Sequence, residues 1–158
     1  MIELLTITIL ILGFAVAAIT FLHAYRPHIG VSKIERIAAE KTNSLKIKVT
    51  IVNAGNTPAY NVTAFATWSI SEHTVEFIPN SIFIILPNTV YSGEPTFSSE
   101  KEIPLEEVSL KILVEYSAPP LLFNCIERKF KFNAQFKFEG NINNPKIIPV
   151  EMNDKYIF

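Results

Sequence analysis

Hydrophobic and polar residues alternate along much of the chain after residue 26. The longest run separates its apolar side chains by lysine, asparagine or glutamine, and these apolar residues are Phe130, Phe132, Ala134, Phe136 and Phe138. A period of two is typical of antiparallel β-strands that have one buried side and one solvent-facing side. The pattern therefore predicts a strand here rather than a helix.

The same alternation recurs along the rest of this region. It is found at residues 45–51, 62–70 and 108–116, and shorter apolar runs lie at residues 29–37, 74–78 and 81–86. Pro79-Asn80 and Pro87-Asn88 predict turns between these runs, and Pro119-Pro120 predicts a break.

Seven or eight strands then fall within residues 26–139. Two sheets must pack face to face, because one sheet alone would leave its apolar side in water. We therefore expect a mainly β fold, an immunoglobulin-like antiparallel β-sandwich with Trp68 in its core. Residues 140–158 are expected to form a C-terminal tail of loop, in which Pro149 limits any edge strand over Lys146–Val150.

The first part of the chain has a different pattern. Leu4–Leu22 contains 19 residues and no charged side chain. Extended to Tyr25, a helix rising about 1.5 Å per residue spans roughly 33 Å, enough for a hydrocarbon core of about 30 Å. Residues 1–25 are therefore predicted to form one transmembrane helix. Its membrane-facing side chains would be Leu4, Leu5, Ile7, Ile9, Leu10, Ile11, Leu12, Phe14, Val16, Ile19, Phe21 and Leu22.

A cleaved signal peptide fits this segment less well, because Glu3 and no basic residue precedes the apolar run. The basic residues nearest the span all follow it, namely Arg26, Lys33, Arg36 and Lys41. The positive-inside rule then places the β domain on the cytoplasmic side of a single-pass cell-membrane protein. The lone Cys125 agrees with a reducing compartment. The alternative is an extracytoplasmic domain, where Asn61-Val62-Thr63 would be a glycosylation sequon.

One short motif joins two predicted strands. It runs from Asn53 to Ala59 with the sequence NAGNTPA. Gly55 can take a positive φ, and Asn56 tolerates one. Pro58 has a fixed φ and no N–H donor, so the hydrogen-bonded ladder must pause there. We expect a strand-end turn or bulge that leads the chain into the next strand.

The motif carries a family resemblance. Ile47–Val62, IKVTIVNAGNTPAYNV, resembles bacterial and archaeal immunoglobulin-like domains related to the cell-adhesion CARDB group. The chain is also similar to uncharacterised single-pass membrane proteins with one N-terminal span, an Arg-Pro pair (here Arg26-Pro27) and such a sandwich. The resemblance implies a non-enzymatic interaction or scaffolding role, and it carries no catalytic residues.

The composition argues against several classes of function. A net charge of −1 and the lack of a recognisable module argue against nucleic-acid binding. A single cysteine precludes an intramolecular disulfide or a multi-cysteine metal site. His23 and His28 are interpreted as interfacial residues, His73 as a surface residue, and Asp154 as part of a tail too mobile for a catalytic triad. We expect no enzyme, no metal site and no cofactor.

Basic side chains gather on the last long predicted strand. Their ordinary interpretation is a solvated strand face that discourages edge pairing. A more specific interpretation is contact with anionic lipid headgroups, because a short linker would hold the domain close to the membrane. The candidate residues for this contact are Arg26, Arg128, Lys129 and Lys131.

Together these features predict a membrane-anchored, non-catalytic β-sandwich module. Its partners would be the lipid bilayer and another protein, in an interaction or an envelope scaffold. The alternative is a structural subunit of a pilus- or archaellum-like filament, with the N-terminal helix in the filament core. In either case the helix offers a route to a homo-oligomer. The usual basic, glycine-containing prepilin leader does not precede the apolar run, which argues against the filament.

Overall fold

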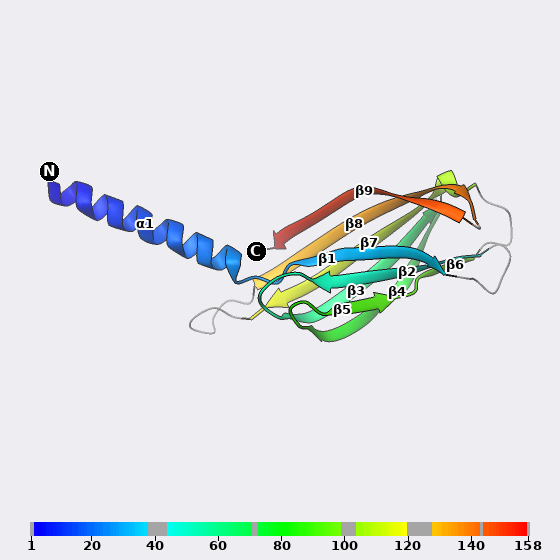
Figure 1. The fold of residues 1–158 in the computed structure, drawn as a ribbon, viewed down its shortest axis with the longest axis horizontal. Helices are drawn as coiled ribbons and strands as arrows, with labels where there is room; N and C mark the ends of the chain where they lie inside the picture. The colour runs from blue at the N-terminus through cyan, green and yellow to red at the C-terminus, as the bar shows by residue number, and fades with distance from the viewer. Residues whose placement is uncertain are drawn as a thin grey trace.

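In the described part of the chain, one helix projects from the end of a β-sandwich (Figure 1). The structure is a computed structural model. It describes residues 2–37, 44–70, 73–98, 104–119, 128–142 and 144–157. The mainly β architecture with two antiparallel sheets confirms the predicted β-sandwich.

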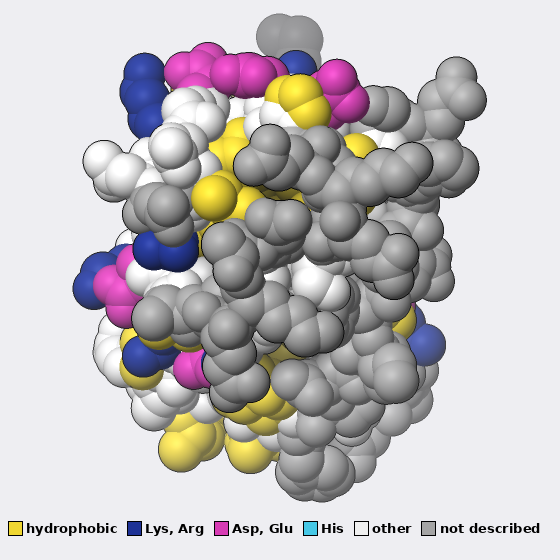
Figure 2. All heavy atoms as spheres, turned by 90° about the vertical axis from the view of Figure 1, so that its right-hand side faces the viewer, with side chains coloured by type: hydrophobic (Ala, Val, Ile, Leu, Met, Phe, Trp, Pro, Cys, Tyr) yellow, Lys and Arg dark blue, Asp and Glu magenta, His cyan; other side chains and the backbone are white. Residues whose placement is uncertain are grey.

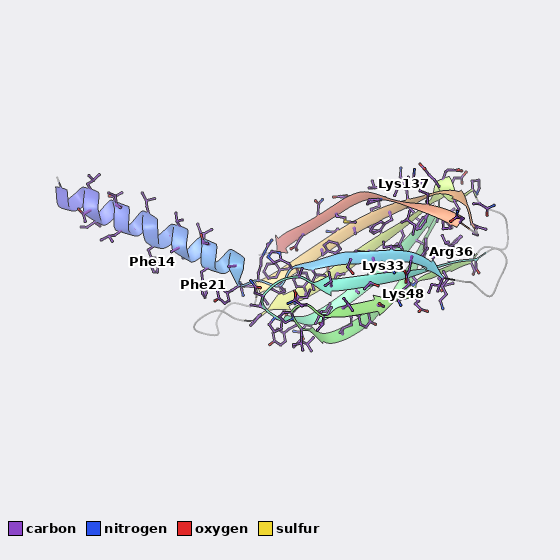
Figure 3. The ribbon with its side chains drawn as sticks, in the orientation of Figure 1. Phe14, Phe21, Lys33, Arg36, Lys48 and Lys137 are labelled. Atoms are coloured by element: carbon purple, nitrogen blue, oxygen red, sulfur yellow. The ribbon has the colours of Figure 1, made fainter. Side chains whose placement is uncertain are left out.

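Helix α1, Ile2–Ala24, meets the sandwich only at its C-terminal end (Figure 1). Its large apolar side chains are exposed, from 42% for Phe21 to 79% for Phe14, and both project from the helix in Figure 3. The side chains of Leu4 and Leu22 lie outside the described ones. Over the described residues, no helix reaches the length and apolar character needed to cross a membrane.

The first sheet is built around β2, Ser44–Asn53. On one side β2 pairs with β1, Ile29–Ile37, which has a bulge between Val31 and Lys33. On the other side it pairs with two short strands, β5, Val90–Gly93, and β6, Thr96–Ser98. All of these pairings are antiparallel.

The second sheet has five strands in the order β4-β3-β7-β8-β9. Their bounds are Ala59–Ile70 for β3, His73–Ile85 for β4, Val108–Ala118 for β7, Arg128–Asn141 for β8 and Asn144–Ile157 for β9. A 3₁₀ turn, η1, Leu105–Glu107, leads into β7.

The core lies between the two sheets and follows the alternation in the sequence. Along β8, buried Phe130, Phe132, Ala134, Phe136 and Phe138 are separated by more exposed residues. Trp68 has no exposed surface, and its ring centroid lies 5.8 Å from that of Phe97 and 5.5 Å from that of Phe138. These three aromatic side chains join β3, β6 and β8, so they hold the two sheets together.

The two predicted runs at residues 74–78 and 81–86 form one continuous strand, β4, and the turn predicted at Pro79-Asn80 is wrong. A bulge explains the difference. Asn80 pairs with Ala64 and Phe77 with Ala66, so two residues of β4 oppose Phe65 alone. Proline is tolerated because β4 is an edge strand, where a missing N–H need not break a ladder.

The C-terminal segment also differs from the expected loop. Its glycine, asparagine and proline residues gather near the β8–β9 hairpin, where Gly140 has a φ of 87°. From there β9 pairs with β8 as far as Ile157. A register shift opposite Gln135 and Phe136 accommodates Pro149, again on an edge strand.

Replacing Trp68 with alanine tests the packing of the core. We expect Trp68→Ala to lower the free energy of unfolding by about 3–5 kcal/mol, because it removes a fully buried aromatic side chain between two others. Chemical denaturation of both proteins measures this difference. Lys111→Ala, at an exposed position of β7, should change stability by no more than about 0.5 kcal/mol. Equal effects of the two variants would contradict this account of the core.

Candidate functional site: the junction of helix and sandwich

Polar contacts from several parts of the described chain converge on the linker between α1 and β1. It consists of Tyr25, Arg26, Pro27 and His28, and Pro27 is fully buried. Groups from the β2–β3 connection, the start of β8 and the end of β9 all contact this linker. The junction therefore joins segments that are far apart in the sequence.

Asn53, the last residue of β2, makes the central contacts. Its side-chain oxygen accepts hydrogen bonds from the backbone N–H of His28 at 3.1 Å and of Gly55 at 3.0 Å. Its amide nitrogen donates to the carbonyls of Thr57 at 2.8 Å and Ile85 at 3.1 Å. Asn53 is fully buried, so its side chain cannot bond to water. The four hydrogen bonds instead satisfy both N–H donors of the amide and use its oxygen twice.

Gly55 lets the linker approach the β2–β3 connection closely. A Cβ atom at this position would lie 2.5 Å from both the Arg26 carbonyl oxygen and the His28 nitrogen. Neither Gly55 nor Asn56 adopts the positive φ that each could tolerate. Glycine is required here by lack of space for a side chain, not by a left-handed backbone.

The other residues of the motif complete the connection. The backbone N–H of Ala54 donates to the His28 carbonyl at 2.8 Å, and the Asn56 side chain donates to the Ala24 carbonyl at 3.4 Å. The second bond satisfies one of the carbonyls left open at the helix C-terminus. Pro58 directly precedes β3, whose pairing with β4 starts at Ala59.

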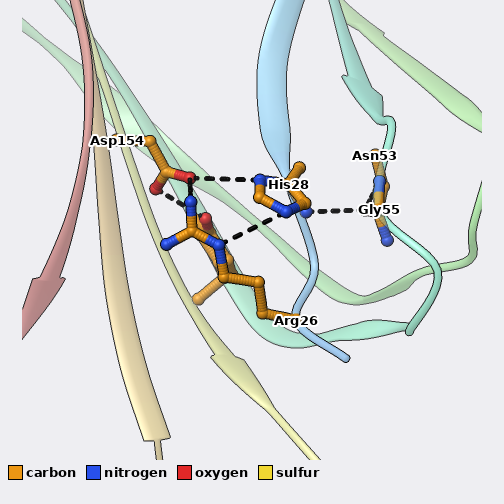
Figure 4. A network of polar contacts seen from close by, with 6 residues as sticks. Arg26, His28, Asn53, Gly55 and Asp154 are labelled. Atoms are coloured by element: carbon orange, nitrogen blue, oxygen red, sulfur yellow. Dashed lines mark hydrogen bonds and ion pairs between the residues drawn. The ribbon is translucent and has the colours of Figure 1, made fainter. Parts of the chain in front are cut away.

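A group of ionisable side chains covers the opposite side of the linker (Figure 4). Asp154 of β9 accepts a hydrogen bond from the Tyr116 hydroxyl at 2.8 Å and lies 3.7 Å from the Arg26 guanidinium. His28 Nδ1 is 3.8 Å from the same carboxylate, and Arg26 Nε donates to His28 Nε2 at 3.3 Å. Arg26 and His28 thus both lie beside the same carboxylate.

Burial raises the pKa of Tyr116, and the nearby Asp154 carboxylate raises it further. The hydroxyl therefore remains a hydrogen-bond donor at physiological pH. In this network the carboxylate is occupied by its neighbours, and the His28 Nε2 lone pair accepts from arginine. Such an arrangement positions backbone segments; it does not present an activated nucleophile. The described part of the chain also holds no cluster of three or more metal-ligating side chains.

Arg128 attaches the start of β8 to the end of the helix. It is only 7% exposed, and its guanidinium donates to the carbonyls of Tyr25 and Pro119 at 3.1 Å each. A cation in this position also interacts favourably with the negative end of the helix dipole. This burial does not agree with the lipid contact predicted for Arg128.

The other predicted lipid contacts lie in different surroundings. Arg26 is half-buried against Asp154, and Lys131 forms an ion pair with Glu115 at 3.1 Å. Lys129 is exposed on β8. Contact of these three residues with lipid headgroups stays a prediction.

Sequence reasoning missed Asp154, His28 and Tyr116 as a group. The error followed from treating residues 140–158 as a loop, because only the pairing of β9 brings Asp154 to the linker. A signal was present, since Val150, Met152 and Tyr156 alternate with polar residues in the way that predicts a strand. Cys125 lies outside the described residues.

No family model, curated protein or solved structure matches the chain. The resemblance of the NAGNTPA stretch to CARDB-related domains therefore stays a prediction.

Changing Asn53 to aspartate tests the central hydrogen bonds with little change in shape. The new carboxylate would face the Thr57 and Ile85 carbonyls with no hydrogen to donate. We expect a loss of about 2–5 kcal/mol in the free energy of unfolding, since buried, unpaired groups result. Asn88→Asp, which adds the same charge at an exposed turn, should be close to neutral. Similar unfolding midpoints for the two variants would refute the role assigned to Asn53.

Changing Gly55 to alanine tests the close approach of the linker to the β2–β3 connection. The added methyl group overlaps two backbone atoms of the linker, so we expect a loss of about 1–3 kcal/mol, measured by denaturant unfolding. Gly30→Ala is the matched control, because its Cβ would meet nothing within 4 Å. The interpretation fails if both alanine variants are as stable as the original chain.

Proposed function

We propose that this protein is a membrane-anchored, non-catalytic β-sandwich that serves protein–protein interaction or envelope scaffolding. The observation that carries the proposal is an isolated helix whose large apolar side chains are exposed on all sides. A helix that is apolar all round requires an apolar environment. A bilayer supplies that environment, and the sandwich would remain in water as the functional domain.

The length of the uncharged run in the sequence supports membrane anchoring. The uncharged run extends from Leu4 to Leu22, beyond the described side chains at both ends. Counted on to Tyr25, that run gives 22 residues and about 33 Å of helix against roughly 30 Å of hydrocarbon. Thr20 Oγ1 donates to the Val16 carbonyl at 2.9 Å, so that hydroxyl needs no water. Tyr25, stacked on Phe21, suits the interface at the helix end.

The topology supports an immunoglobulin-like sandwich. In such domains strands A, B and E form one sheet, while C, F and G form the other. Here β1, β2 and β5 share a sheet, and β3, β7 and β8 follow each other in the second. Trp68 on β3 corresponds in position to the buried tryptophan of strand C. On this proposal β9 is an additional edge strand.

The described polar groups support an interaction module more than an enzyme. The cluster of ionisable side chains around Asp154 is engaged in holding the linker. The sandwich leaves long edge strands, β4 and β9, at the sides of its larger sheet, and unpaired edges are a common route for partner binding. The basic residues that follow the apolar run favour a cytoplasmic position for the domain.

Flotation with liposomes tests the proposal. The full chain should need detergent for purification and should float with phosphatidylcholine vesicles after reconstitution. Leu10→Lys combined with Phe14→Lys should abolish flotation, because each lysine near the helix centre costs about 2.5–3.5 kcal/mol. The matched control is Val150→Lys with Met152→Lys, at similarly exposed apolar positions on β9, which should float normally.

Two outcomes would contradict membrane anchoring by α1. A chain that is monodisperse without detergent and stays with the aqueous phase has no need of a bilayer. Detergent-free polymers seen by electron microscopy would instead favour the filament subunit, because the apolar helix would then be buried among copies of itself.

A further inference from the structure

We propose that the β4–β5 turn, Leu86–Val90, docks on the interfacial layer of the same bilayer that holds α1. This inference rests on the membrane anchoring proposed above and adds a second contact between the protein and lipid. It assigns a role to the exposed apolar side chains of the turn, Leu86 and Val90, which the core does not use.

The turn is connected to the helix junction through Asn53. The backbone N–H of Asn88 donates to the Asn53 carbonyl at 2.8 Å, and the N–H of Asn53 donates to the Thr89 carbonyl at 3.3 Å. The side chain of the same Asn53 accepts from the N–H of His28 in the linker. One residue thus binds both the turn and the helix linker, so the turn lies at the helix end of the sandwich (Figure 1).

The conformation of the turn is held by local hydrogen bonds. Thr89 donates to the Leu86 carbonyl from its hydroxyl at 2.7 Å and from its backbone N–H at 3.2 Å. Asn88 adopts a positive φ of 57°, which asparagine tolerates. The turn is therefore a preformed shape that presents Leu86, 50% exposed, and Val90, 63% exposed, to the outside.

The distribution of charge favours lipid as the occupant. No charged residue occurs in the sequence between Glu76 and Glu94, which includes the turn, or between Lys48 and Glu72, which includes the neighbouring β2–β3 connection. Arg36 and Lys137 lie toward the opposite end of the sandwich (Figure 3). Figure 2 looks onto that end and shows basic and acidic side chains around it. At the helix end, Arg26, Arg128 and Asp154 are held in contacts of the junction, and Lys129 is exposed at the start of β8.

The lack of charge in the turn matters because charged groups cost much more to move out of water than an uncharged turn whose polar groups are hydrogen-bonded. A bilayer around α1 would be the nearest apolar medium to the turn. Contact of the turn with lipid would then limit how far the sandwich can tilt relative to the membrane. The contacts of the linker would limit this tilt as well.

Tryptophan fluorescence in vesicles tests the inference with the full chain. The natural Trp68 is fully buried, so bromine on lipid cannot contact it. Its emission, measured in the unmodified chain, is subtracted from that of each variant. Leu86→Trp probes the turn, Phe14→Trp probes helix insertion, and Ser98→Trp, exposed on β6, is the control on the sandwich. Each variant is reconstituted in phosphatidylcholine vesicles with and without bromine on the acyl chains, since bromine quenches tryptophan on contact.

We expect brominated lipid to quench Phe14→Trp and Leu86→Trp, but not Ser98→Trp, and the emission of Leu86→Trp to be blue-shifted relative to Ser98→Trp. Quenching of Phe14→Trp alone would overturn the docking of the turn and leave the anchor intact. Quenching of neither would overturn both. A Leu86→Trp signal that is blue-shifted but insensitive to bromine would show that protein, not lipid, covers the turn, and would overturn the inference.

Discussion

The position of the helix relative to the sandwich depends on the hydrogen bonds of one buried amide. Asn53 ends a central strand of the first sheet, and its side chain binds the linker, its own turn and the end of β4. Only an amide can accept from two backbone N–H groups and donate to two carbonyls in this space. Gly55 supplies the room for it by removing the side chain that would separate the turn from the linker.

The remaining contacts of the junction come from parts of the chain far from Asn53. Arg128, at the start of β8, binds a carbonyl at the end of the helix, and Asp154, near the end of β9, neutralises Arg26. Both sheets therefore contribute to holding a segment of four residues. This distribution explains why the ionisable cluster is a structural device: the contacts described for it are made to backbone or to another member of the group.

Sequence reasoning predicted the parts of the fold that depend on local periodicity. Alternation placed the long strands correctly, because one face of each is buried against the other sheet, as Phe130–Phe138 of β8 illustrates. It failed at Pro79 and Pro149, since edge strands and bulges tolerate proline and this context is not visible in local composition. The importance of the NAGNTPA turn was predictable, but its reason was not. Lack of space at Gly55 and the approach of Asp154 arise from tertiary contacts of both residues with His28, which lies far from each in the sequence.

Hydrogen exchange at two backbone amides tests the central claim most directly. In the intact chain in detergent micelles, followed by NMR, the account predicts that the His28 and Gly55 amides exchange as slowly as amides in the centres of β2 and β7, because opening them requires the Asn53 side chain to leave its buried position. Exchange of these two amides at the rate of an exposed loop would show that the linker is not held by the sandwich, and would contradict the account.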